Sequence, residues 1–185
     1  MADRPNTAAH VMYELATSKW HNVVQRWIAL APDGRGRCGL SVTEKVVTKA
    51  TPKFVLLDQL TADEAEFDWL MLCDDDVEVG PDIVDNVIGL SNEFDFALSQ
   101  PARTADGFID HPIVQVMPGL LGCRIRFVEI GSIVCIRRDA MALLLPFGET
   151  GGMGWGLNFV WPSKTLARYP HLTLEEAFTV IKAYA

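Results

Sequence analysis

The chain has 185 residues, of which 49% are hydrophobic and 22% are charged. This composition excludes a disordered chain and fits one domain spanning residues 1–185. Its 24 acidic and 16 basic residues give a formal net charge of −8, which argues against a nucleic-acid-binding protein because an acidic surface repels phosphates. No apolar run reaches the roughly 20 residues of a membrane-spanning helix. No secretory signal is recognisable, and four widely spaced cysteines fit a reducing, cytoplasmic location.

The first sixty residues carry short apolar runs with weak periodicity. The run near the N-terminus indicates a strand over residues 10–16, and apolar positions on one helical face favour a helix over 20–30. A turn with two glycines follows at 32–36. We then expect short strands over 39–42 and 53–57, separated by a helical turn over 43–50.

The middle of the chain has a clearer pattern. Residues 67–73 form a nearly continuous apolar run, as in a strand that is covered on both faces. A glycine and a proline precede a predicted helix over 82–90, and the next predicted strand covers 94–99. This order of strand, helix and strand favours a βαβ unit. We therefore expect an α/β fold whose mixed, mostly parallel sheet is flanked by helices.

The second half alternates irregular and regular segments. Residues 100–122 contain several prolines and predict no regular element. A run rich in β-branched residues predicts a strand over 127–136. The remaining expected elements are a short helix over 139–145, a glycine-rich loop over 148–156, a helix start over 156–161 that Pro162 interrupts, and a helical tail over 172–184.

Asp74, Asp75 and Asp76 directly follow the predicted strand over 67–73. Ligands of open α/β sheets bind beyond the carboxyl ends of the strands. Adjacent carboxylates repel one another, and a hard divalent cation offsets that repulsion. Because alternate side chains of an extended chain lie on the same side, Asp74 and Asp76 are predicted to converge on one ion while Asp75 faces away. The alternative is a solvated acidic turn without a ligand.

Several short motifs occur in a fixed order between Phe67 and Pro162. The acidic triplet ends the first strand, and it is followed by Gln100-Pro101-Ala102, His111-Pro112-Ile113, Phe127-Val128-Glu129-Ile130, Arg138-Asp139-Ala140 and Gly154-Trp155-Gly156-Leu157-Asn158. The strand that ends in the acidic triplet resembles the corresponding segment of GT-A glycosyltransferases. More narrowly, the ordered motifs together resemble a bacterial and plant family, classed as glycosyltransferases, with DDD and GWGLD motifs.

The resemblance implies a GT-A fold and the metal-dependent transfer of a sugar from a nucleotide diphosphate donor to a hydroxyl of a carbohydrate or another acceptor. It implies that Mn²⁺ or Mg²⁺ is held by Asp74 and Asp76. It also implies nucleotide-sugar contacts from Asp74, Asp75, Asp76 and Thr17, and acceptor contacts from His111, Trp155 and Gly156. Aromatic faces stack well on sugars, although Trp155 is as typical of an ordinary core residue.

Two positions depart from the family pattern. Asn158 stands where the family has an aspartate, which in inverting enzymes takes the proton from the acceptor hydroxyl. An amide cannot accept that proton at neutral pH, so either Glu149 takes the catalytic role or the chain transfers sugar poorly. Of the late histidine segment that GT-A enzymes often use to bind the metal, only His171 remains, and it is as typical of a surface residue.

Two other interpretations stay open. One is a catalytically impaired domain that binds a nucleotide sugar without turnover, which Asn158 favours. The other is a nucleotidyltransferase similar to sugar-nucleotide pyrophosphorylases, although residues 10–19 lack the expected glycines. Separately, Glu129 lies inside an apolar strand and needs a partner when buried. Candidate partners are Arg124, Arg126 and Arg137.

Overall fold

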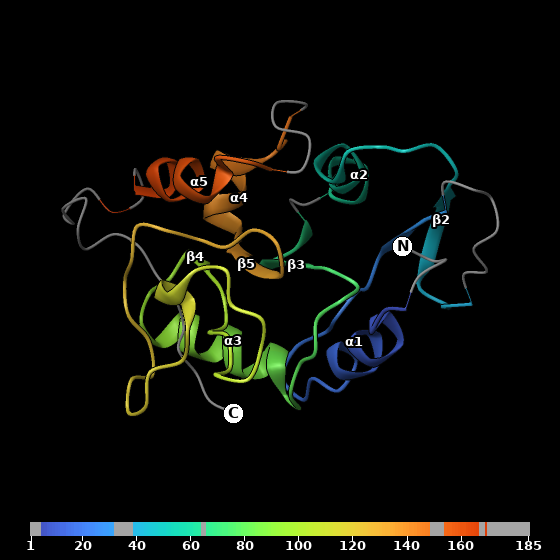
Figure 1. The fold of residues 1–185 in the computed structure, drawn as a ribbon. Coiled ribbons are helices and arrows are strands. Elements are labelled where there is room, and N and C mark those ends of the chain that lie inside the picture. Colours follow the sequence, from blue (N-terminus) through green and yellow to red (C-terminus); the bar gives the residue numbers. More distant parts are fainter. Residues whose placement is uncertain (1–4, 32–38, 64–65, 149–153, 167–168, 170–185) are drawn as a thin grey trace.

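Strand β5 (Ile133–Arg137) is the middle strand of a three-stranded sheet. It pairs antiparallel with β3 (Trp69–Cys73) on one side and with the two-residue strand β4 (Leu98–Ser99) on the other. Two further strands, β1 (Trp27–Leu30) and β2 (Thr43–Val47), form a separate parallel pair, at the right of Figure 1. The computed structural model describes residues 5–31, 39–63, 66–148, 154–166 and 169.

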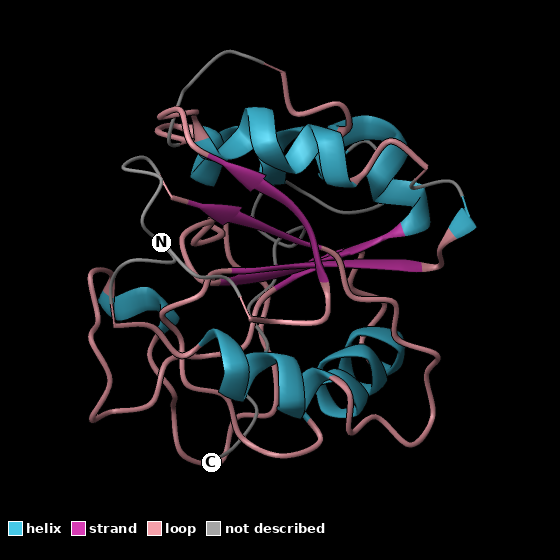
Figure 2. Ribbon diagram, turned by 90° about the vertical axis from the view of Figure 1, so that its right-hand side faces the viewer, coloured by secondary structure: helices cyan, strands magenta, loops and turns pink. Residues whose placement is uncertain are grey.

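Helices cover both faces of the three-stranded sheet, as Figure 2 shows. Ile133 and Cys135 of β5 pack into one cluster with α1 and α3, whereas Val134 and Ile136 pack into the other with α2, α4 and α5. A strand buried on both faces is apolar throughout, which explains the uninterrupted apolar runs of β3 and β5. The helices are α1 (Ala8–Leu15), α2 (Lys53–Leu60), α3 (Ile83–Glu93), α4 (Arg138–Leu144) and α5 (Leu157–Thr165), with a 3₁₀ turn over Pro112–Val114.

Most predicted elements of the middle and second half are present, with two corrections. Helix α5 continues through Pro162, which we expected to interrupt it, and the strand expected over 94–99 is reduced to β4. The strand expected over 67–73 is β3, and the helix expected over 82–90 is α3. The short helix expected over 139–145 is α4. The strand expected over 127–136 occupies only the end of that range and the following residue, because β5 covers Ile133–Arg137.

The helices and strands predicted for the first sixty residues are wrong, and no strand covers 39–42. The turn expected over 32–36 lies outside the described residues. Residues 10–16 belong to helix α1, whose Val11 and Leu15 are spaced four apart and both buried. Residues 53–57 begin helix α2. Conversely, the helix expected over 20–30 ends as strand β1, and the helical turn expected over 43–50 contains strand β2. Short apolar runs fit both the helical period of 3.6 residues and the strand period of two. Packing against the rest of the chain therefore decides which structure they adopt.

The described residues form a small mixed α/β fold, but the expected mostly parallel sheet is not what they show. β3 and β4 run parallel to each other, as a βαβ unit requires, yet β5 lies between them and runs opposite to both. The chain makes a long excursion over residues 100–132 before it returns as β5. An antiparallel strand needs no crossover helix, so this excursion is free to remain irregular.

Candidate functional site

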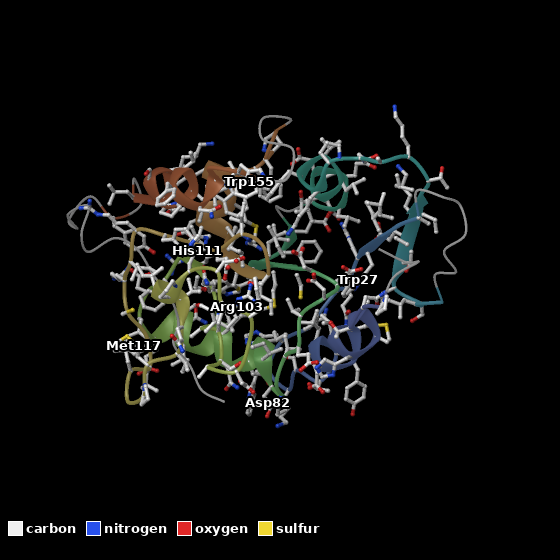
Figure 3. All side chains as sticks on the ribbon, viewed as in Figure 1. Trp27, Asp82, Arg103, His111, Met117 and Trp155 are labelled. Atoms are coloured by element: carbon white, nitrogen blue, oxygen red, sulfur yellow. The ribbon has the colours of Figure 1, made fainter. Side chains whose placement is uncertain are left out.

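A cavity of about 1040 Å³ lies beside the carboxyl end of β3. Its walls include Trp27 of β1, Lys53 of α2, Cys73 of β3 and the acidic turn, which we define as Asp74–Asp76. Figure 3 shows Trp27 in the space between β1 and the segment that follows β3. Asp75, which we expected to face away, also contributes to the lining. The structure therefore brings all three strand-end carboxylates to the wall of one cavity.

Backbone hydrogen bonds hold the acidic turn in place. The amide of Asp74 donates to the carbonyl of Ser132 at 3.0 Å, which extends the pairing of β3 with β5. The amide of Thr7, at the start of α1, donates to the carbonyl of Asp75 at 2.7 Å. The Thr7 hydroxyl also donates to the carbonyl of Val77. Thr7, the N-cap of α1, thus holds the acidic turn in place, a role that the sequence pattern did not indicate.

Lys53 forms an ion pair with the first carboxylate of the turn. Its Nζ lies 2.5 Å from Oδ1 of Asp74 and donates a second hydrogen bond to the carbonyl of Ile130 at 3.2 Å. The side chains of Lys53 and Asp74 are 21% and 27% exposed. Burial raises the pKa of Asp74, and the nearby Lys53 ammonium opposes that rise. At the cavity wall, the negative charge of Asp74 is therefore neutralised by the ammonium of Lys53.

Cys73 directly precedes the acidic turn and takes no part in its charge chemistry. Burial, reinforced by the charge of Asp74, raises the pKa of the Cys73 thiol to about 12. Nucleophiles and metal ligands need the thiolate form. At neutral pH Cys73 is therefore protonated, and it packs with Met71 and other apolar residues of the α1 and α3 side.

The donor atoms of the acidic turn are carboxylate oxygens, which suit the hard cations Mg²⁺ and Mn²⁺. Within the described residues, no three His, Cys, Asp or Glu side chains are placed to enclose a metal ion. Mg²⁺ is commonly held by only one or two carboxylates together with the phosphates of a substrate. The described residues therefore form no closed metal cage, and a cation held by the turn would take its remaining ligands from elsewhere.

Arg26 lines the same cavity but is engaged by other carboxylates. Its guanidinium forms two hydrogen bonds to the carboxylate of Asp63, and its Nε lies 3.5 Å from Glu44. The hydrogen bonds from Arg26 lower the pKa of Asp63. This cluster links the residue before β1, strand β2 and the loop after α2. Among the described residues, the ion pair observed at the acidic turn is the one between Lys53 and Asp74.

A second group of predicted residues gathers at the start of α5. Trp155 is 89% exposed and so is not a core residue, and Gly156 has the left-handed φ of +90°. The carbonyl of Asn158 accepts a hydrogen bond from the amide of Val128 at 3.1 Å. Pro162 explains this bond, because it has no N–H to donate to the carbonyl four residues earlier. The proline therefore leaves Asn158 free to tie α5 to residues 127–130.

His111 belongs to the same region through its ring contacts. It packs edge-on against Phe127, with ring centroids 4.7 Å apart, and Phe127 packs in the same manner against Phe159 of α5 at 5.4 Å. Figure 3 shows His111 and Arg103 on the segment that precedes β5, and Trp155 beside α5. The structure thus brings His111 toward α5, while neither His111 nor Trp155 contributes to the cavity beside the acidic turn.

Glu129 is buried, and the partner that the structure shows for its carboxylate is Arg103. It is 6% exposed, and its Oε2 accepts a hydrogen bond from Nε of Arg103 at 3.0 Å. Arg124 instead donates to the carbonyl of Phe94, and Arg137 pairs with Asp95 and Asp139. Next to this pair, the side-chain oxygen of Gln100 accepts from the amide of Glu129, and its amide nitrogen is buried without a partner among the described residues.

The remaining predicted site residues lie elsewhere. Thr17 follows helix α1, where its hydroxyl donates to the carbonyl of Glu14 at 2.7 Å, and it does not line the cavity. Glu149, His171 and the expected tail helix over 172–184 lie outside the described residues. No helix in the described part of the chain combines the length and the apolar content needed to cross a bilayer.

Comparisons with models of protein families, with curated proteins and with solved structures found no match for this chain.

Proposed function

We propose that this chain binds a nucleotide diphosphate sugar in the cavity beside the acidic turn and transfers the sugar to an acceptor hydroxyl. One observation carries the proposal: strand-end carboxylates and a lysine line a cavity of about 1040 Å³. Small-molecule sites commonly measure about 300–1000 Å³. Carboxylates can hold a divalent cation and the lysine can contact phosphate, so the wall offers both kinds of partner that a diphosphate needs.

In this proposal Asp74 and Asp76 hold Mg²⁺ or Mn²⁺, and Asp75 and Lys53 complete the wall beside the diphosphate. A bound cation of this kind stabilises the negative charge of a departing diphosphate. Trp20 is exposed and lines the cavity together with Trp27, so either indole offers a face for the nucleotide base. Thr17 has no role here, since its hydroxyl bonds to α1.

The acceptor side of the proposal lies at the start of α5. The exposed face of Trp155 is available to stack on a sugar, with Gly156 and His111 beside the same helix. The Asn158 side chain cannot accept a proton from the acceptor, and Glu129 is held by Arg103. Glu149 therefore carries the proton-accepting role in this proposal.

A second candidate function is nucleotide-sugar binding without turnover. Asn158 favours it, because its side chain is an amide, which cannot take a proton from the acceptor. The two functions differ in one measurable respect. A transferase consumes the donor when an acceptor is present, whereas the binding domain leaves the donor intact, and Asn158→Asp raises turnover only in the transferase.

Donor binding tests both functions first. Thermal shifts are measured for UDP-, GDP-, CMP- and dTDP-sugars with Mn²⁺ and with EDTA, because a ligand that binds the folded state raises the melting temperature. We expect one donor to stabilise the protein in Mn²⁺. Asp76→Asn is expected to weaken that binding at least tenfold, whereas Asp106→Asn, at an exposed position outside the cavity, leaves it unchanged. The proposal fails when no donor binds in Mn²⁺, or when Asp76→Asn binds the donor as the natural chain does.

A further inference from the structure

Lys53 and a divalent cation compete for the same carboxylate. The Lys53 ammonium already lies 2.5 Å from Oδ1 of Asp74, and the carbonyl of Ile130 holds it there. A cation bound to that oxygen would be in direct contact with the ammonium, and like charges at such a distance repel strongly. Both side chains are less than a third exposed, so water screens this repulsion only partly.

A diphosphate removes the conflict, because it offers the ammonium another partner. Lys53 is the first residue of α2 and lines the cavity, so its flexible stem can turn the ammonium from Asp74 toward a ligand in that cavity. Phosphate oxygens accept hydrogen bonds from an ammonium at least as well as a carboxylate does. Asp74 is then free to bind the cation while the phosphate neutralises both positive groups.

We infer that Lys53 acts as a built-in competitor for the metal ion, so that the cation and the diphosphate of the donor bind cooperatively. The inference rests on the proposed function, since it specifies how the same cavity loads its ligands. Two consequences follow from it. The cation alone binds weakly, and diphosphate alone retains measurable affinity because Lys53 contacts it without a metal. Coupling of this kind is reciprocal, so each ligand strengthens the other by the same factor.

The test replaces Lys53 by methionine in the full chain and measures two affinities separately. Mn²⁺ binding without phosphate is followed by electron paramagnetic resonance, and binding of inorganic pyrophosphate in EDTA is followed by calorimetry. For Lys53→Met we expect Mn²⁺ affinity to rise at least tenfold and pyrophosphate affinity to fall at least tenfold. Lys53→Arg, which keeps the positive charge, restores the pattern of the natural chain in both measurements.

Two controls separate this effect from a general disturbance of the fold. Lys45→Met removes an exposed lysine of β2 that bonds Gln59 outside the cavity, and it is expected to change neither affinity. Lys53→Met combined with Asp74→Asn is expected to lose the gain in Mn²⁺ affinity. Where Lys53→Met does not fold, Lys53→Gln gives the same comparison, because it also removes the charge.

The opposite signs of the two changes make the result decisive. The inference is overturned when Mn²⁺ affinity is unchanged or weaker in Lys53→Met, when neither protein binds Mn²⁺, or when pyrophosphate binds both proteins equally. These outcomes are distinct from failure of the proposed function. Inorganic pyrophosphate carries no base or sugar, so the Lys53 effect can hold although every nucleotide sugar fails, and it can fail although a donor binds.

Discussion

The acidic turn and the region near the start of α5 each contain a pair of oppositely charged side chains, but only the pair at the acidic turn lines the cavity. At the acidic turn a carboxylate and a lysine pair at the wall of a large cavity. Near the start of α5, the buried Glu129 is held by the half-buried Arg103 away from the cavity, and the ring of Trp155 is exposed to solvent. A charged pair that lines a cavity can exchange partners with a ligand there, whereas a pair outside the cavity with a buried carboxylate stabilises the fold.

The difference indicates how the two regions divide the proposed reaction. In the proposed function, the carboxylates and the lysine of the cavity contact the anionic donor, and the exposed ring of Trp155 contacts the uncharged acceptor sugar. Helix α2 joins the regions. Its first residue reaches Asp74, and its Phe54 lies against Gly154, just before Trp155.

The largest expected effect comes from a substitution at Gly154, where α2 packs against the residues before α5. A Cβ on Gly154 would overlap the ring of Phe54 and the side chain of Ile130, and Gly154 has the left-handed φ of +91°. We expect Gly154→Ala to lower the free energy of unfolding by about 3 kcal/mol, from overpacking and backbone strain together. Gly119→Ala is the matched control, because Gly119 has a φ of +80° but open space around it. Its expected loss is about 1 kcal/mol, and equal losses in urea denaturation would contradict the packing argument.

An intermediate effect tests whether the buried pair is purely structural. Glu129→Gln leaves the half-buried Arg103 without its carboxylate, so we expect the free energy of unfolding to fall by about 2 kcal/mol. Because Glu129 does not line the cavity, binding of pyrophosphate and of Mn²⁺ stays as in the natural chain. A loss of either affinity in the folded variant would show that the two regions are not separate.

The smallest expected effect concerns the wall of the cavity. Hydrogen bonds from Arg26 lower the pKa of Asp63 below the usual 3.8, so the folded state favours the charged carboxylate. This contribution to stability is present at pH values above 3.8 and is lost as the pH falls through the lowered pKa. Asp63→Asn is therefore expected to melt at a slightly lower temperature at pH 7 and to equal the natural chain in strong acid. A constant difference between the two melting curves at every pH would contradict this account.

The sequence predicts an element of the fold correctly where a long apolar run is compatible with only one kind of secondary structure. The run over 67–73 is too apolar for an exposed element, and it ends at three aspartates, so both β3 and the acidic turn are predictable. The segment over 53–57 is not, because its apolar run fits a strand or a helix. Pro52 directly before Lys53 is a signal typical of a helix start, and it predicts α2 better than the apolar run does.

Contacts between distant parts of the chain explain what the sequence missed in the site. Lys53 meets Asp74, Thr7 meets Asp75, and Arg103 meets Glu129, and no local periodicity relates the members of these pairs. The end of a predicted strand identifies carboxylates that can face a ligand. The lysine that neutralises Asp74 comes from another element, α2, which the sequence does not place beside it. The position of Asn158 shows the same limit, since its carbonyl bond to Val128 follows from Pro162 only once α5 and residues 127–130 are known to pack together.

The central claim is that the acidic turn and Lys53 hold a cation and a diphosphate in one cavity. Crystals grown with Mn²⁺ and the donor that gives the largest thermal shift test it directly, since manganese is located by its anomalous scattering. The account predicts a manganese peak bonded to Asp74 or Asp76, with the diphosphate between the ion and the Lys53 ammonium. Manganese bound away from the acidic turn, or a diphosphate outside the cavity, would contradict it.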